Sequence, residues 1–243
     1  GIRDLVRSRG LGDVYKRQAP DHAAVLHQRA AAWFAANDDF DEAIAHALQS
    51  DAALAADLIG QAAPGRLTGR QAATVLGWLR ALPDGTLRAD PRLMVAMAWA
   101  LFAAESRATA EPWLGDAEAA LASTGGAADD ASPAAHAEAL GAAAALRAQM
   151  ASWDGDVDAA LRHSAVALET LGPGSIWRAD VALAVGAAHH LRGDVPAAID
   201  TFRAAVVDAE AAGRAEAAIF ARAMLAESLF LAGRLTDAAT VVD

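Results

Sequence analysis

Apolar side chains recur every three or four residues along almost the whole chain of 243 residues, and alternating apolar and polar positions are hardly seen. A period near 3.6 residues is typical of amphipathic helices, whereas strict alternation is typical of strands. Short breaks such as Ser132-Pro133, which has the residue types of a helix start, separate these segments. The pattern predicts an all-α protein with helices near 22–36, 41–50, 52–63, 68–81, 91–105, 108–123, 133–153, 156–171, 176–192, 195–212, 214–232 and from 235 to the end.

Three short turn segments share one sequence pattern, which indicates an internal repeat. Their glycines, Gly155, Gly193 and Gly233, lie 38 and 40 residues apart. A repeat of about this length is typical of stacked helical hairpins, each of which buries an apolar face against its neighbours. The sequence therefore predicts an α-solenoid, a superhelix of stacked antiparallel hairpins.

The middle unit of this repeat resembles a tetratricopeptide repeat. Gly186 stands where the two helices of such a hairpin approach closely, and Gly193 stands at the turn seven residues later. Ala198, Phe202 and Ala205 occupy the small, large and small contact positions of the second helix. The resemblance implies that these residues form the interface of one hairpin.

The other units match the tetratricopeptide pattern less well. Arg147 takes a usually apolar position in the unit before, Ala226 replaces the close-contact glycine in the unit after, and His189 replaces an aromatic residue in the middle unit. An earlier hairpin, from Trp33 to Ile44, fits the same scheme with Asp38 and Asp39 at its turn. The resemblance therefore extends over several units, with departures in each.

Two stretches resemble a specific family, the large LuxR-type, MalT-like transcriptional regulators. The sequence LHQRAAAWF at 26–34, followed by DEAIAHAL at 41–48, is similar to the segment after the ATPase part of these proteins. The sequence WLRALP at 78–83, followed by Pro91-Arg92-Leu93, resembles the next landmark before their sensor domain. The resemblance implies a helical linker over 19–90 and a repeat superhelix over 91–243 that is truncated at the C-terminus. ATP would then bind only in a missing N-terminal module, and DNA would bind at a missing C-terminal helix-turn-helix.

The first eighteen residues differ in composition from the rest. They contain the chain's only lysine and only tyrosine, and no alanine. Residues 13–18, DVYKRQ, back-translate to the end of a transposase-based sequencing adapter, so we interpret residues 1–18 as translated adapter that is not native. The alternative is a natural basic arm or a targeting peptide, although the apolar or Ser-rich stretch of a targeting peptide is absent. We therefore expect the native sequence to begin at Ala19.

Charge and composition argue against several functions for residues 19–243. They carry 15 basic and 29 acidic side chains, a net charge of −14, which disfavours direct nucleic-acid binding. They contain no lysine for a P-loop, and the whole chain has no cysteine. The seven histidines have no metal-ligand spacing, and the longest apolar run, 93–104, is too short for a membrane span. We expect a cytoplasmic protein without a metal, a cofactor or a catalytic site in this part.

Aromatic and polar residues of the first helices are the candidate contacts for a ligand. The six tryptophans (33, 78, 99, 113, 153 and 177) lie on apolar faces, so we expect core packing for most of them. The tetratricopeptide resemblance implies a concave surface formed by the first helix of each hairpin. It places seven residues there as possible ligand or partner contacts: Gln149, Trp153, Asp180, Leu183, His190, Glu227 and Phe230.

Three functions remain open from the sequence. The preferred hypothesis is a signal-sensing and self-association module of a bacterial LuxR-type regulator, which would bind a small-molecule inducer or a protein partner. The second is a free-standing tetratricopeptide scaffold for a partner protein or peptide. Such scaffolds need converging basic side chains to clamp a carboxylate terminus, and the seven positions supply acid, amide and aromatic groups instead. The third, an enzyme, has no motif in its favour.

Overall fold

The computed structural model describes residues 20–67, 71–123 and 132–242, and these residues form thirteen helices and no strand. Residues 1–18, interpreted above as adapter, lie outside this part. The helices are α2 (Pro20–Ala36), α3 (Phe40–Ala47), α4 (Ala52–Arg66), α5 (Ala72–Ala81), α6 (Asp84–Ala89), α7 (Pro91–Ala104), α8 (Arg107–Ser123), α9 (Pro133–Trp153), α10 (Val157–Thr170), α11 (Arg178–Leu191), α12 (Val195–Ala211), α13 (Ala215–Leu231) and α14 (Leu235–Val242). The prediction of an all-helical chain is confirmed.

Each of the twelve predicted segments contains a helix, and one further helix was missed. The sequence analysis left residues 82–90 unassigned, whereas the structure places the six-residue α6 there. Leu82 precedes a proline and adopts the extended backbone that this position favours, which ends α5. Pro83 then begins α6, so a sequence that is typical of a loop forms a short helix instead.

Many of the helices have an acidic or hydroxyl residue at the N-cap position. Ser132 Oγ accepts a hydrogen bond from Ala135 N–H at 3.2 Å, which confirms the predicted start of α9. Asp156 and Asp194 cap α10 and α12 in the same way. Such caps satisfy backbone donors that have no partner within the helix, and each typically contributes about 1 kcal/mol.

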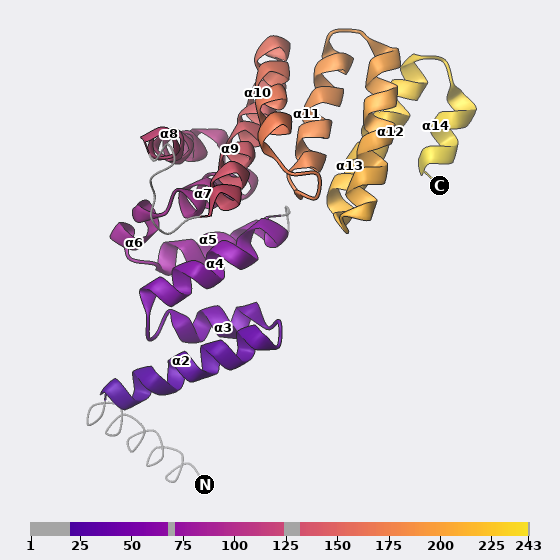
Figure 1. The fold of residues 1–243 in the computed structure, drawn as a ribbon. Coiled ribbons are helices and arrows are strands. Elements are labelled where there is room, and N and C mark those ends of the chain that lie inside the picture. The colour runs from indigo at the N-terminus through magenta and orange to yellow at the C-terminus, as the bar shows by residue number, and fades with distance from the viewer. Residues whose placement is uncertain (1–19, 68–70, 124–131, 243) are drawn as a thin grey trace.

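Neighbouring helices pack in pairs, and the hairpins from α9 to α14 lie side by side (Figure 1). The predicted turn glycines stand between the two helices of these pairs. Gly193, for example, has a φ of +79°, a conformation that side chains with a Cβ rarely adopt. In the α2–α3 hairpin the corresponding turn residue is Asp38, with a φ of 60°. The predicted turn positions are therefore confirmed.

The contact residues predicted for the α11–α12 hairpin lie at the interface between these two helices. Ala198, Phe202 and Ala205 are buried in the core, as predicted. A Cβ placed on Gly186 would lie 2.5 Å from Cε1 of Phe202, so the ring fills the space that the glycine leaves. A second close approach was not predicted: a Cβ on Gly141 of α9 would lie 2.4 Å from Cδ2 of Leu171. The glycines thus mark where the helices are closest.

The hydrophobic core consists of two large clusters among the described residues. One contains buried side chains between residues 31 and 181, and the other contains side chains between 179 and 229. The first cluster includes residues on both sides of position 90, the expected boundary between linker and repeats. That boundary remains a prediction. No described helix is both long and apolar enough to cross a membrane.

The tryptophans divide between the core and the surface. Trp99 and Trp177 are buried and stack with their ring centroids 4.8 Å apart. Trp33 and Trp153, however, are 61% and 74% exposed, and they are exceptions to the core packing expected for most of the tryptophans. Both stand near the C-terminal end of their helices, α2 and α9.

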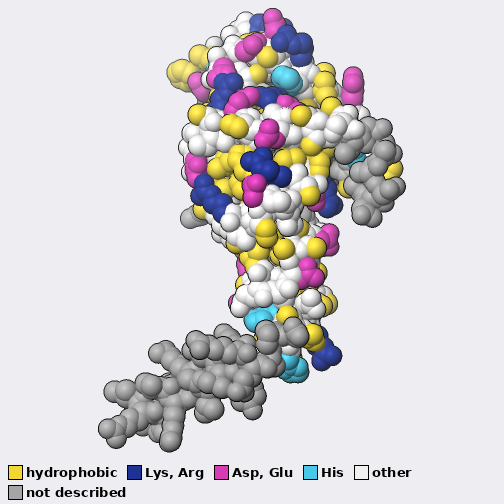
Figure 2. Space-filling model, turned by 90° about the vertical axis from the view of Figure 1, so that its left-hand side faces the viewer, with side chains coloured by type: hydrophobic (Ala, Val, Ile, Leu, Met, Phe, Trp, Pro, Cys, Tyr) yellow, Lys and Arg dark blue, Asp and Glu magenta, His cyan; other side chains and the backbone are white. Residues whose placement is uncertain are grey.

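One face of the molecule shows hydrophobic side chains around adjacent basic and acidic groups (Figure 2). Among the described residues, Arg88 of α6 lies 4.4 Å from the ring centroid of Trp113 on α8. Its guanidinium also pairs with Asp84 and with Asp116, at 3.1 and 2.9 Å. The cation–π contact and the ion pair with Asp116 connect α6 to α8, whereas the pair with Asp84 lies within α6.

Candidate functional site

A pocket of about 330 Å³ lies where the first helices of four neighbouring helix pairs meet, namely α7, α9, α11 and α13. We call it the four-helix pocket. Its lining residues are Leu67, Trp99, Phe102, Ala103, Gln149, Trp153, Asp180, Leu183, Arg214, Glu216, Ala217 and Phe220. Most of this lining is apolar or aromatic, with a few polar groups, as is common for small-molecule sites.

The pocket brings together four of the seven residues predicted as contacts: Gln149, Trp153, Asp180 and Leu183. Leu183 and Asp180 are nearly covered, whereas most of the Trp153 side chain is exposed. Gln149 of α9 donates from Nε2 to the backbone oxygen of Asp180 on α11, at 2.8 Å. This hydrogen bond connects two of the helices that form the pocket.

The other three predicted residues do not line the pocket: His190 is at the C-terminal end of α11, and Glu227 and Phe230 are in the C-terminal half of α13. The Nδ1 atom of His190 is 3.2 Å from Oγ of Ser228, and its Nε2 is 3.9 Å from Oε1 of Glu227. Phe230 is 63% exposed. The expected single surface therefore divides into the pocket and a separate polar contact.

A buried ion pair forms one side of the four-helix pocket. Arg214, at the start of α13, donates to both carboxylate oxygens of Asp180, and its Nη1 also donates to the backbone oxygen of Ile176 at 2.8 Å. The two side chains are only 12% and 11% exposed. Burial raises the pKa of the Asp180 carboxyl above its usual range, and the Arg214 guanidinium opposes this rise. The guanidinium thus favours the ionised form of the buried Asp180 carboxyl.

Aromatic rings connect the pocket to the core. Trp177 stacks on Trp99, Trp99 meets Phe102 edge to face, and Phe102 meets Trp153 with ring centroids 5.4 Å apart. The indole Nε1 of Trp99 donates to the backbone oxygen of Ala142 at 3.0 Å, which holds the inner rings in place. The outermost ring, Trp153, therefore packs against Phe102 on the core side and is exposed at the pocket.

Sequence reasoning missed Arg214, Phe102, Glu216 and Phe220 as pocket residues. Arg214 stands at the N-cap position of α13 without a side-chain hydrogen bond to the helix, and its guanidinium reaches Asp180 instead. Two of the repeated turns continue from glycine to a capping aspartate, but Gly233 is followed by Arg234 just as Gly213 is followed by Arg214. The turn pattern therefore does not single out Arg214.

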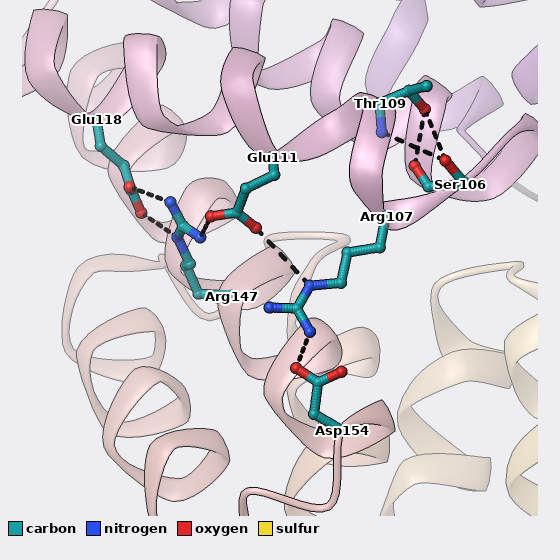
Figure 3. A network of polar contacts seen from close by, with 7 residues as sticks. All are labelled: Ser106, Arg107, Thr109, Glu111, Glu118, Arg147 and Asp154. Carbon is teal, nitrogen blue, oxygen red and sulfur yellow. Dashed lines mark hydrogen bonds and ion pairs between the residues drawn. The ribbon is translucent and has the colours of Figure 1, made fainter.

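A second polar cluster joins α8 to α9 and explains a departure from the repeat pattern (Figure 3). Arg147 donates to both carboxylate oxygens of Glu118, at 2.9 and 2.7 Å, and also pairs with Glu111. Arg107 bridges Glu111 to Asp154 at the end of α9. The carboxylates raise the pKa of Arg147, the side chain that replaces the usual apolar residue. Each charged side chain of this cluster pairs with an opposite charge, although Glu111 Oε2 is buried without a hydrogen bond, so the cluster fits a structural role.

The described residues contain no group of three or more His, Asp or Glu side chains that could hold a metal ion. The histidines His27 and His46 are in contact, with their Nδ1 atoms 2.8 Å apart, and His46 stacks on Phe34. This pair packs α2 against α3. The four-helix pocket therefore remains the best candidate site, and its groups are suited to binding.

No protein-family model matches the chain, and comparison with curated proteins shows a partial similarity to a kinase. The serine/threonine-protein kinases PknK of Mycobacterium tuberculosis, strain H37Rv, and of Mycobacterium bovis are each 36% identical to this chain over 107 residues. The match covers 44% of this chain and 10% of each kinase. The chain thus spans about a tenth of the length of the curated relatives it matches, and the similarity concerns a segment of these longer proteins.

Proposed function

We propose that residues 19–243 form a ligand-sensing and protein-interaction module of a bacterial LuxR-type, MalT-like transcriptional regulator. In this proposal the paired helices continue as a tetratricopeptide-like α-solenoid, and the chain itself contains neither the ATPase nor the DNA-binding part. The recurrence of glycine turns between paired helices supports the repeat arrangement. The order of the two family-like stretches in the sequence supports the choice of family.

The observation that carries the proposal is the four-helix pocket. Its residues come from four helices that are far apart in sequence, so a bound molecule would contact several repeat units at once. A ligand that binds one arrangement of these helices better than another shifts the protein toward that arrangement. Such coupling is what a sensing module needs in order to report on a ligand to distant domains.

The partial similarity to PknK is compatible with a module that is used in more than one kind of multidomain protein. PknK is a serine/threonine-protein kinase, but the match covers only a tenth of that protein. We propose that this chain is not itself an enzyme, since the pocket combines aromatic rings with an amide and paired charges. Its small-molecule ligand would act as an inducer and not as a substrate.

A thermal-shift screen with a library of bacterial metabolites tests the sensing function. We expect at least one compound to raise the melting temperature of the chain and of Trp33→Ala, and to raise that of Trp153→Ala much less. Trp33 is a matched control because it is an exposed tryptophan on α2, away from the pocket. If every stabilising compound acts equally on the two variants, the pocket is not the sensing site.

A second candidate function, a scaffold for a partner protein, is favoured by exposed apolar side chains on α13. Ile219, Phe220 and Phe230 are 67%, 49% and 63% exposed. Aromatic and aliphatic side chains of this kind often anchor protein interfaces. The neighbouring coding DNA separates the two functions: a P-loop upstream and a helix-turn-helix downstream support the regulator, and their absence supports the scaffold.

A further inference from the structure

The hydrogen-bond donors of the four-helix pocket are largely engaged within the protein. Trp99 Nε1 donates to Ala142, Gln149 Nε2 donates to Asp180, and Arg214 donates to Asp180 and Ile176. The remaining indole N–H, that of Trp153, is at the open edge of the pocket. A ligand therefore finds few charged or amide donors to bind it.

Two acceptors in the same pocket have no partner among the described residues. Oε1 of Gln149 accepts no hydrogen bond there, because only Nε2 of this side chain is engaged. Glu216, a half-buried residue in the first turn of α13, forms no hydrogen bond or ion pair with the described residues. Both residues line the four-helix pocket, and an unpaired carboxylate and amide oxygen there would favour a ligand that donates hydrogen bonds.

The charges of the pocket favour a ligand that carries a positive charge. Asp180 and Arg214 neutralise each other as a buried pair, so Glu216 leaves the pocket with one net negative charge. The residues after the adapter-like segment carry a net charge of −14, which further disfavours an anion. A cation is attracted both by the local carboxylate and by the chain as a whole.

Aromatic side chains of the pocket could also contact a cationic ligand. Phe102, Trp153 and Phe220 line the pocket, and Trp153 and Phe220 keep 74% and 49% of their surface exposed. The face of an aromatic ring attracts an ammonium or guanidinium group, and tryptophan does so most strongly. Rings that meet a carboxylate in one cavity are a common arrangement for recognition of an organic cation.

We propose that the four-helix pocket binds a small organic cation, a protonated amine attached to an apolar body. The ammonium group pairs with Glu216 and Gln149 Oε1, and the apolar body packs between Trp153, Phe102 and Phe220. This inference rests on the proposed sensing function, because it names the ligand class of the same pocket. It implies that the regulator responds to amines.

Calorimetric titration of the whole chain with three matched probes tests the ligand class. The probes are phenylethylammonium, the neutral 2-phenylethanol and the anionic phenylacetate. We expect the cation to bind about tenfold more tightly than the neutral probe, with no saturable binding of the anion. If the neutral or the anionic probe binds as tightly as the cation, the ligand class is wrong, although the pocket still binds a ligand.

Two pairs of variants locate the binding. Glu216→Gln should weaken binding of the cation about fivefold, and Glu169→Gln, which changes an exposed carboxylate on α10, should leave it unchanged. Trp153→Ala should weaken it similarly, whereas Trp33→Ala should not. Equal affinity in all four variants, or no binding of the cation to the unaltered chain, overturns the inference. In the latter case the metabolite screen with Trp153→Ala still decides separately whether the pocket is a sensing site.

Discussion

At the scale of single residues, one of the two closest helix approaches among the described residues is the contact between Gly186 and Phe202. Because a Cβ at position 186 would lie 2.5 to 2.8 Å from three atoms of the ring, alanine cannot enter without moving the phenylalanine. The ring is fully buried and has little room to move. The glycine is therefore required by packing, even though its backbone is helical.

We predict that Gly186→Ala lowers the free energy of unfolding by about 2 kcal/mol, because overpacking forces side chains and backbone to shift. Gly115→Ala is the matched control, since Gly115 is also helical but nothing lies within 4 Å of the added Cβ. That variant should gain up to about 1 kcal/mol from helix propensity. Urea denaturation measures both, and an unchanged or raised stability of Gly186→Ala would contradict the contact.

The Asp180–Arg214 pair leads to a second prediction at this scale. Asp180→Ala leaves a buried guanidinium without its carboxylate and should lower the free energy of unfolding by about 3 kcal/mol. The double variant Asp180→Leu with Arg214→Met removes both charges and should lose less than half as much. Urea denaturation of both variants checks this. Equal losses would mean that the pair is not electrostatically coupled.

At the scale of helices and hairpins, the features that follow from local sequence were predictable and those that join distant residues were not. The turn at Gly193 and the contact residue Phe202 follow from spacing within one unit, so the repeat pattern predicted them. The Arg214–Asp180 pair joins residues 34 positions apart, and no local pattern indicates which carboxylate an arginine will reach. The exposure of Trp33 was not predictable, because helical spacing shows which face of a helix is apolar, but not whether a neighbour covers it.

The contact between α9 and α10 also has a consequence for pH. Burial, together with the nearby Arg147, lowers the pKa of His163 below its ordinary value of 6.5. The unfolded chain therefore binds a proton more readily than the folded chain as the pH falls through 6.5. The neutral histidine contributes stability above this pH, and that contribution is lost as the pH decreases.

We predict that His163→Gln reduces the loss of stability between about pH 7.5 and pH 5.5. His22→Gln, which changes an exposed histidine on α2, should leave this pH dependence as it is. Denaturation midpoints measured across this range compare the variants with the unaltered chain. An identical pH dependence for His163→Gln would show that this side chain titrates alike in both states.

At the scale of the whole molecule, the chain is expected to recognise ligands without chemistry of its own. We predict that the isolated chain neither hydrolyses ATP nor shifts a DNA probe, because residues 19–243 lack lysine and carry a net charge of −14. A phosphate-release assay and a gel-shift assay check the two parts. Phosphate release above a blank without protein would contradict the assignment of ATP chemistry to another part of the protein.

Amide hydrogen exchange of the whole chain, with and without small metabolites extracted from bacterial cells, tests the central claim most directly. If the four-helix pocket is a sensing site, the extract slows exchange in the pocket segments of α9, α11 and α13, and leaves α2 and α3 unchanged. Slower exchange confined to α2 and α3, or no change in any segment, would contradict the claim that this pocket recognises the signal.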